Sequence, residues 1–136
     1  MDNLMEEKAR DAVAEAETIE RQDPFYDLKF KMDIITPGLA DNFRHIQDEQ
    51  FMLFLRKNLD YGSKNITAGL NLENAEEVKF VLNGLWYRIS DKVNRWRNLL
   101  MKGEAEVQNE SLLDIFQDIA NYACISSLVA RGLWKS

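Results

Sequence analysis

The stretch "NESLLDIFQDIANYACI", residues 109–125, decides the fold class because it has the pattern of a helix with two different faces. Apolar residues recur along it at the spacing of a core face. Three carboxylates stand four residues apart and so share one strip of the helix: Glu110, Asp114 and Asp118. Such a strip either faces water or holds a metal ion, and spacing alone leaves both interpretations open.

Helical signals extend over most of the 136 residues. Thr36 followed by Pro37 favours a helix start, and Gly62 is typical of a helix stop. Asn74 with Glu77 fits a capping box. Because no β-hairpin signal accompanies them, we predict an all-α antiparallel bundle of about four helices. The predicted organisation is a single domain, 1–136, with an N-terminal arm and connector, 1–36, and a helical core, 37–136.

The arm is the most acidic part of the chain. Residues 1–23 hold eight acidic and three basic side chains, whereas the whole chain has a net charge of -6. A helix from residue 3 to residue 22 would have only a thin stripe of small apolar residues, which buries little area. We therefore expect this helix to pack weakly or against another subunit, in a homo-oligomer. The next segment, "DPFYDLKFKMDII" at 23–35, is expected to be extended or a loop.

Composition excludes several classes of protein. No run of eighteen apolar residues exists, so no membrane span is predicted. The single cysteine rules out an internal disulfide or a cysteine-built zinc site. No basic field is present, which argues against direct binding of duplex nucleic acid. The N-terminus lacks the apolar region of a secretory signal, so a cytoplasmic location is predicted, in the host cytoplasm if the protein is viral.

The helix predicted for residues 74–102 and the last helix each have an apolar and a polar stripe. The apolar stripe of the first is expected to form the core seam: Val78, Leu82, Leu85, Ile89, Val93, Trp96 and Leu100. The corresponding face of the last helix is Leu112, Phe116, Ile119, Ala123 and Ala130. A short connection predicts that the two helices are antiparallel neighbours. Their polar stripes would then meet in one cluster: Asp91, Arg95, Asn98, Glu110, Asp114, Asp118 and Asn121.

The carboxylates of this cluster suggest a metal site. Mg²⁺ prefers oxygen ligands, usually a few carboxylates together with substrate phosphate. We expect Glu110, Asp114 and Asp118 to hold Mg²⁺, with Asp91 as a further catalytic carboxylate. The alternative is that Glu110 only complements a helix dipole, while Asp114 and Asp118 form ordinary ion pairs between helices.

Basic side chains near these acids suggest phosphate as the ligand. Arg88 and Arg95 have paired N–H groups that suit phosphate oxygens, and Lys64 adds a mobile charge. Asn98 and Asn121 are expected to orient the ligand or its base. Carboxylates with nearby Arg and Lys fit Mg²⁺-dependent hydrolysis of a phosphoanhydride.

Three ordered motifs resemble a known family. "YGSKN" at 61–65, "DKVNRWRNLL" at 91–100 and "ESLLDIFQDIANYACI" at 110–125 resemble the nucleotide-modification-associated domain, type one, of phages and bacteria. The resemblance implies a role in modified-nucleotide metabolism and DNA modification. It also implies these site residues: Tyr61, Gly62, Lys64, Asn65, Asp91, Lys92, Arg95, Asn98, Glu110, Asp114, Asp118, Asn121 and Tyr122.

The chain also has a looser likeness to the all-α nucleoside triphosphate pyrophosphohydrolases of MazG and dimeric dUTPase type. Those enzymes use an E-x-x-E motif followed by E-x-x-D, whereas here Glu110 and Asp114 are four residues apart. The predicted function is therefore nucleotide binding, with Mg²⁺-dependent hydrolysis of (deoxy)nucleoside triphosphates as its enzymatic form. The alternatives are a non-catalytic accessory protein, a protein that sequesters a nucleotide signal against host defence, and a structural scaffold. The preferred base and phosphate stay open.

Overall fold

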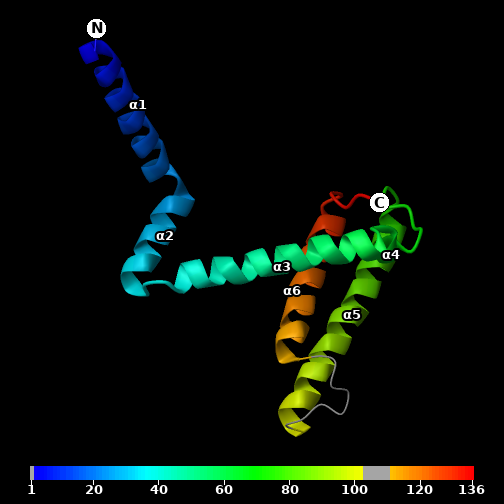
Figure 1. Ribbon diagram of the computed structural model, residues 1–136. Coiled ribbons are helices and arrows are strands. Elements are labelled where there is room, and N and C mark those ends of the chain that lie inside the picture. Colours follow the sequence, from blue (N-terminus) through cyan, green and yellow to red (C-terminus); the bar gives the residue numbers. More distant parts are fainter. Residues whose placement is uncertain (1, 103–110) are drawn as a thin grey trace. The chain divides into compact units, whose positions relative to one another are not determined.

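The computed structural model describes residues 2–102 and 111–136, and every regular element in these ranges is a helix (Figure 1). The six helices are α1 (Asp2–Gln22), α2 (Pro24–Ile35), α3 (Leu39–Tyr61), α4 (Lys64–Thr67), α5 (Ala75–Lys102) and α6 (Leu112–Ala130). The predicted all-α class is confirmed, whereas the four-helix bundle stays a prediction. None of these helices has the length and apolar character needed to cross a membrane.

The chain forms two compact units, residues 1–47 and 48–136. In the first unit, residues 24–35 are helical, so the expectation of an extended piece or loop is wrong. The reason is local: the side chain of Asp23 accepts a hydrogen bond from the Phe25 N–H at 2.9 Å, and Pro24 stands in the first turn. An Asp–Pro pair is therefore an N-cap with its first helical residue.

The start of α3 also differs from the prediction. Thr36 does not open a helix; it ends α2, where its N–H donates to the carbonyl of Met32 at 2.8 Å. Gly38 follows with a φ of 84°, a left-handed conformation that favours glycine, and α3 begins at Leu39. Thr36 and Pro37 thus lie in the turn between two helices.

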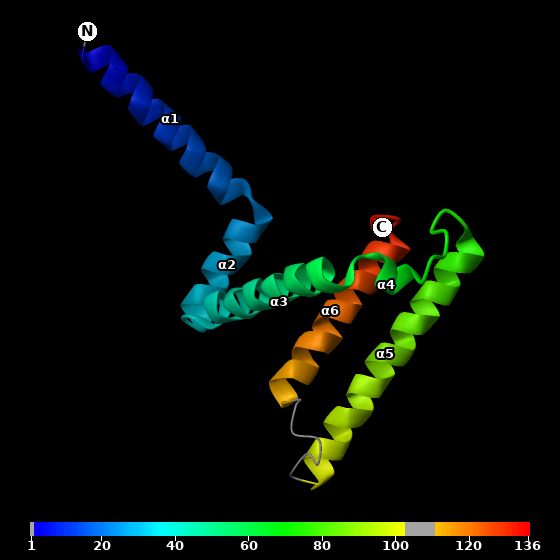
Figure 2. The ribbon, with the colours of Figure 1, turned by 45° about the vertical axis from the view of Figure 1, so that its right-hand side comes forward.

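The second unit is built on α5 and α6, which run antiparallel and side by side in both ribbon views (Figures 1 and 2). The side chain of Asn74 accepts from the Glu76 N–H at 2.9 Å just before α5. Ser111 is the N-cap of α6 and forms a capping box with Asp114. The antiparallel pairing and the helix start at Asn74 are both confirmed.

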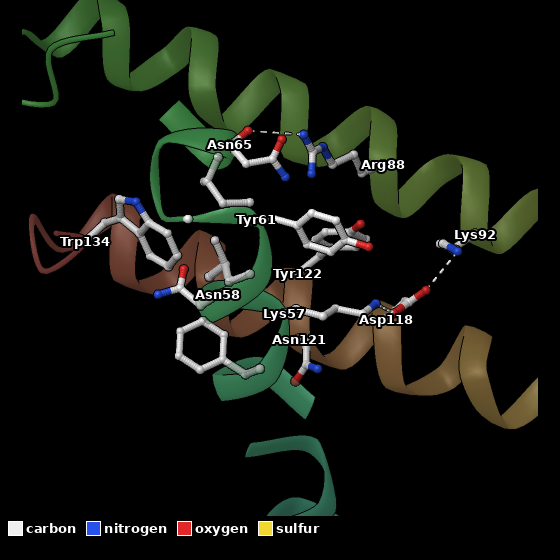
Figure 3. A pocket seen from close by; sticks show the side chains of 14 residues that line it. Lys57, Asn58, Tyr61, Asn65, Arg88, Lys92, Asp118, Asn121, Tyr122 and Trp134 are labelled. Atoms are coloured by element: carbon white, nitrogen blue, oxygen red, sulfur yellow. Dashed lines mark hydrogen bonds and ion pairs between the residues drawn. The ribbon is translucent and has the colours of Figure 1, made fainter. Parts of the chain in front are cut away.

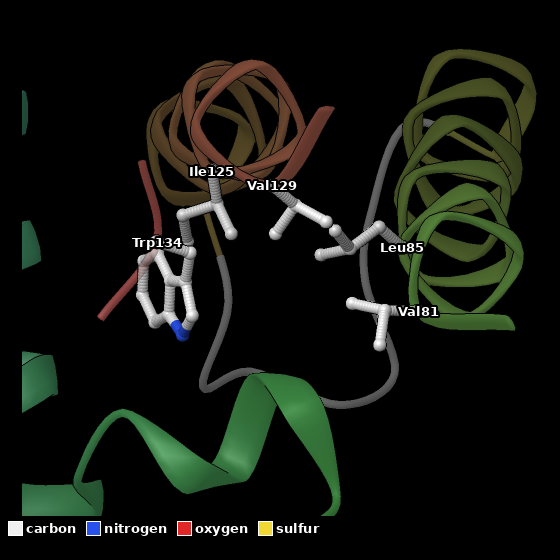
Figure 4. Packing of buried hydrophobic residues seen from close by; sticks show 5 residues of the cluster. All are labelled: Val81, Leu85, Ile125, Val129 and Trp134. Atoms are coloured by element: carbon white, nitrogen blue, oxygen red, sulfur yellow. The ribbon is translucent and has the colours of Figure 1, made fainter. Parts of the chain in front are cut away.

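The core of the second unit lies between α5, α6 and the C-terminal segment (Figure 4). Its buried cluster consists of Val81, Leu85, Ile125, Val129 and Trp134. Ile115 on α6 is also fully buried, at 0% exposure. Burial of such side chains is the main stabilising contribution of this unit, about 1.5–3 kcal/mol for each large one.

The predicted core faces need correction. On α6 the buried residues are Ile115, Asp118, Ile125 and Val129, so the strip that holds Asp118 points inward. No residue of the face predicted from Phe116 is fully buried: Leu112 and Ile119 are half-buried and the others are exposed. Phe116 and Trp96 contact each other edge to face at 4.8 Å. On α5 the predicted seam is buried near Leu85 but exposed at Leu100. Helix periodicity identifies the apolar stripes of a helix, whereas packing against neighbouring helices decides which stripe is buried.

Candidate functional site

A cavity of about 400 Å³ opens in the second unit between α3, α5, α6 and the C-terminal segment (Figure 3). Volumes from about 300 to 1,000 Å³ are typical of small-molecule sites. The lining combines basic, amide and aromatic side chains with one carboxylate: Phe54, Lys57, Asn58, Tyr61, Gly62, Asn65, Ile66, Arg88, Lys92, Asp118, Asn121, Tyr122, Ile125 and Trp134.

Helical periodicity explains how each element supplies these side chains. Lys57 and Tyr61 stand one turn apart on α3, and Arg88 and Lys92 stand one turn apart on α5. On α6 the lining residues follow Asp118 at intervals of three and four. Gly62 has a φ of 74° and ends α3, so the chain turns into α4 and brings Asn65 to the cavity.

Asp118 is held by two lysines from two other helices. Its Oδ1 accepts from Lys57 Nζ and its Oδ2 pairs with Lys92 Nζ, each at 2.8 Å. Burial alone would raise the pKa of Asp118, but the hydrogen bonds and charges of Lys57 and Lys92 outweigh it and lower the pKa. Asp118 is therefore an ionised, partly buried carboxylate that joins α3, α5 and α6.

Arg88 lies at the same cavity with a different set of contacts. Its guanidinium donates to the carbonyl of Asn65 at 3.4 Å and lies 5.7 Å from the centre of the Tyr122 ring, a cation–π distance. In the part of the chain that the structure describes, Arg88 makes no ion pair with a carboxylate. Its charge is thus available to an anionic ligand.

Asn121 carries a polar atom with unused bonding capacity. Its Nδ2 is buried and has no hydrogen-bond partner within residues 2–102 and 111–136. Buried amide groups are nearly always hydrogen-bonded, so an unpaired one is a place where a ligand acceptor would be stabilising. Asn121 lines the cavity, on the same helix as Asp118 (Figure 3).

Trp134 closes one end of the cavity. It is buried, its Nε1 donates to the carbonyl of Ser63 at 3.2 Å, and its ring meets that of Phe54 edge to face at 6.2 Å. These contacts hold the C-terminal segment against the turn between α3 and α4. The cavity therefore has a fixed aromatic wall.

The structure brings eight of the predicted site residues to the cavity lining: Tyr61, Gly62, Asn65, Arg88, Lys92, Asp118, Asn121 and Tyr122. Five others lie outside the lining: Lys64, Asp91, Arg95, Asn98 and Asp114. Glu110 lies outside the described residues. The polar cluster predicted between α5 and α6 is thus divided.

Asp91 and Asp114 show why the predicted cluster divides. Asp91 is on the exposed side of α5, 3.8 Å from Arg95, and the next residue, Lys92, faces the cavity instead. Asp114 Oδ2 accepts from both the N–H and the hydroxyl of Ser111, each at 2.9 Å. The same hydrogen bonds lower the pKa of Asp114. Its carboxylate is therefore used in capping α6.

The predicted metal ligands have other partners in this structure. Asp118 faces two lysines, Asp114 faces Ser111, and among the described residues no three His, Cys, Asp or Glu side chains come together as a metal site. Mg²⁺ stays a prediction, since Glu110 is not among the residues described.

Sequence reasoning missed six lining residues: Phe54, Lys57, Asn58, Ile66, Ile125 and Trp134. Lys57 is the most important of these, because it pairs with Asp118. Its signal was available: Lys57 stands one turn before Tyr61 on the same helix. Trp134 has no such signal, since it follows the last helix and reaches the cavity only through tertiary packing.

These features define a helical protein with a cationic, aromatic-walled pocket. Nucleotide modification associated domain 1 matches residues 57–129, more than half of the chain, and the chain belongs to this family. The resemblance stated from the sequence is thereby confirmed, and the matched region contains nearly all of the cavity lining. No curated protein and no solved structure matches the chain significantly.

Proposed function

We propose that this protein binds a phosphorylated nucleoside in the cavity and serves nucleotide modification through that binding. The observation that carries the proposal is the meeting of Lys57, Arg88 and Lys92 in one cavity that also holds two tyrosines. The family name supports the connection with nucleotides.

The phosphate would lie among the three cations. Arg88 presents a planar fork of donors, which suits phosphate oxygens, and the two lysines add compact charges. Lys92 is only 16% exposed in its side chain, so its charge is weakly screened by solvent. A phosphate group here gains charge-assisted hydrogen bonds without a large rearrangement of the backbone.

The nucleoside would lie against the aromatic and amide part of the lining. Tyr61 and Tyr122 offer rings on which a base can stack, and base–aromatic stacking contributes about 1–3 kcal/mol. The unpaired Nδ2 of Asn121 would donate to a carbonyl or ring nitrogen of the base.

Binding is favoured over hydrolysis by the carboxylate positions. Mg²⁺-dependent hydrolysis of nucleoside triphosphates would need Asp118 to leave two lysines at 2.8 Å and Asp114 to leave its cap. A binder that sequesters or presents a nucleotide, in a phage or bacterial modification system, needs neither change. We therefore place binding first and metal-dependent turnover second.

Calorimetry with the four common deoxynucleoside monophosphates and triphosphates, with and without Mg²⁺, tests the proposal. We expect binding in chelator, and unchanged ligand when the mixture is analysed by chromatography. A Lys92→Met variant should bind about tenfold more weakly or worse. Its matched control is Lys79→Met, which alters an exposed pair with Glu76 outside the cavity. Absence of binding at millimolar ligand would reject the proposal, and Mg²⁺-dependent product would favour the enzyme instead.

We also propose that the protein is a homo-oligomer through its first unit. Helix α2 has no buried residue, and Phe25, Phe30, Ile34 and Ile35 are each more than half exposed. Such apolar surface is costly in water unless another chain covers it. A second copy is the simplest partner, since it carries the same surface. Light scattering should give a mass above 15.8 kDa, and Ile34→Asp should lower it; a monomeric wild type would contradict this.

A further inference from the structure

The charged side chains of the cavity suggest which phosphorylated nucleosides it accepts. Three lining residues are positive, Lys57, Arg88 and Lys92, and one is negative, Asp118, so the lining has a net charge of +2. A phosphate monoester has a charge of about −1.5 to −2 at neutral pH. We infer that the site is built for nucleoside monophosphates and selects against di- and triphosphates, an inference that rests on the proposed nucleotide binding.

Asp118 is the residue that sets this limit. Each of its two oxygens is already engaged by a lysine at 2.8 Å, so it acts as an anion built into the site. One phosphate can share the lysines with Asp118 and take Arg88 as its own partner. A second or third phosphate would meet the Asp118 carboxylate without a further cation to offset the repulsion.

The number of basic side chains in the lining supports the same conclusion. The cavity volume of about 400 Å³ is typical of small-molecule sites, so the charges of the lining, rather than its volume, set the limit. The described lining contains no fourth basic residue: the remaining ten residues are uncharged. Further phosphates would therefore meet no additional cation in the described part of the site.

Arg88 contributes a positive charge to the lining, whereas Asp118 contributes the negative one. Its guanidinium is held in place by the Asn65 carbonyl and the Tyr122 ring, and neither contact neutralises its charge. Removing Arg88 would lower the net charge of the lining to +1, whereas neutralising Asp118 would raise it to +3. The two substitutions thus move the preferred ligand charge in opposite directions.

The test compares ligands of one base that differ only in phosphate number, with the full-length protein in chelator at constant ionic strength. Wild type should bind the monophosphate about threefold tighter than the triphosphate, or more. In Asp118→Asn the ratio of triphosphate to monophosphate dissociation constants should fall about tenfold. Glu76→Gln is the matched control: it removes one exposed negative charge outside the cavity and should leave the ratio unchanged.

Arg88→Met keeps the inference testable if Asp118→Asn does not fold, as judged by circular dichroism. It should weaken the monophosphate about tenfold, but weaken a cyclic monophosphate, which has one negative charge less, by a smaller factor. A triphosphate bound more tightly than the monophosphate by wild type, a ratio unmoved in folded Asp118→Asn, or equal losses for both ligands in Arg88→Met would each overturn the inference. Failure of wild type to bind any of these nucleotides would instead reject the proposed function.

Discussion

The two units of the chain differ in what their helices bury. In residues 1–47, α2 has no buried residue, and Ile35 is 76% exposed. In residues 48–136, Leu85 and Ile115 are 2% and 0% exposed, and a cavity lies beside them. Both units have well-defined local helix signals, including an aspartate N-cap in the first and a capping box in the second. Local sequence signals are therefore sufficient for helices, whereas a buried core and a site also require helices to pack against each other.

Ion pairs show the same difference. In the first unit Lys29 pairs with Asp33 at 2.8 Å and with Asp41 at 3.1 Å, and these contacts raise its pKa, but the side chains are 37%, 36% and 68% exposed, respectively. Exposed pairs of this kind contribute little to stability. In the second unit Asp118 is mostly buried, so its charge would be unpaired away from water without its two lysines. Removing a partner of a buried charge is strongly destabilising.

The largest effect is expected from truncating the core of the second unit. Leu85→Ala should lower the free energy of unfolding by about 2–5 kcal/mol, because it leaves a cavity among Val81, Val129 and their neighbours. The same kind of truncation in the first unit, Ile35→Ala, should cost less than about 1 kcal/mol in the isolated chain. Urea unfolding followed by circular dichroism measures both, and equal losses would contradict the contrast between the units.

A smaller effect is expected from removing one lysine of the buried ion pairs. Lys92→Met leaves Asp118 with a single partner and should lower the free energy of unfolding by about 1–3 kcal/mol. The matched control is Lys31→Met, which removes a surface pair with Asp27 and should change stability by less than about 0.5 kcal/mol. Thermal unfolding of the two variants provides the comparison; a Lys31 variant as unstable as the Lys92 variant would show that burial is not the deciding factor.

Helix caps should have effects of about 1 kcal/mol. Ser111→Ala removes the hydroxyl that accepts from the Asp114 N–H at 3.2 Å, so the start of the packed helix α6 loses a cap. Asp23→Ala removes the corresponding group of α2. Only the Ser111 variant should shift the cooperative unfolding of the core, because α2 has no buried residue. Tryptophan fluorescence, which reports on Trp86, Trp96 and Trp134 of the second unit, follows that transition; a similar shift in both variants would contradict the prediction.

The smallest effect is a pH dependence from Asp118. Its pKa is lowered in the folded protein, so the unfolded chain binds the proton more readily. The resulting stabilisation is fully present above the unfolded pKa of about 3.9 and is lost as the pH falls through the lower, folded pKa. Wild type should therefore lose stability below about pH 4, and Asp118→Asn should show a shallower loss. Thermal scans between neutral and acidic pH measure this; parallel profiles would show that Asp118 does not contribute.

Several features could be predicted because they depend on neighbours in the sequence. The long helices, the stop at Gly62 and the cap at Asn74 follow from short-range patterns. Arg88 follows from the polar stripe of its helix, whereas Lys92 follows only from the family resemblance; both lie in the cavity lining. The errors at Thr36 and at residues 23–35 are also local, since Asp23 and Pro24 are a stronger helix start than Thr36 and Pro37.

The sequence by itself determined the all-α class, the family and the antiparallel pairing of α5 with α6, because periodicity, caps and a short connection act over a few residues. Only the tertiary structure decided which stripe of α6 faces inward, and hence that Asp118 meets Lys57 and Lys92 while Asp91 and Asp114 point elsewhere. The physical reason is that the rotation of a helix about its axis is fixed by the apolar side chains it buries against its partners, here Ile115, Ile125 and Val129.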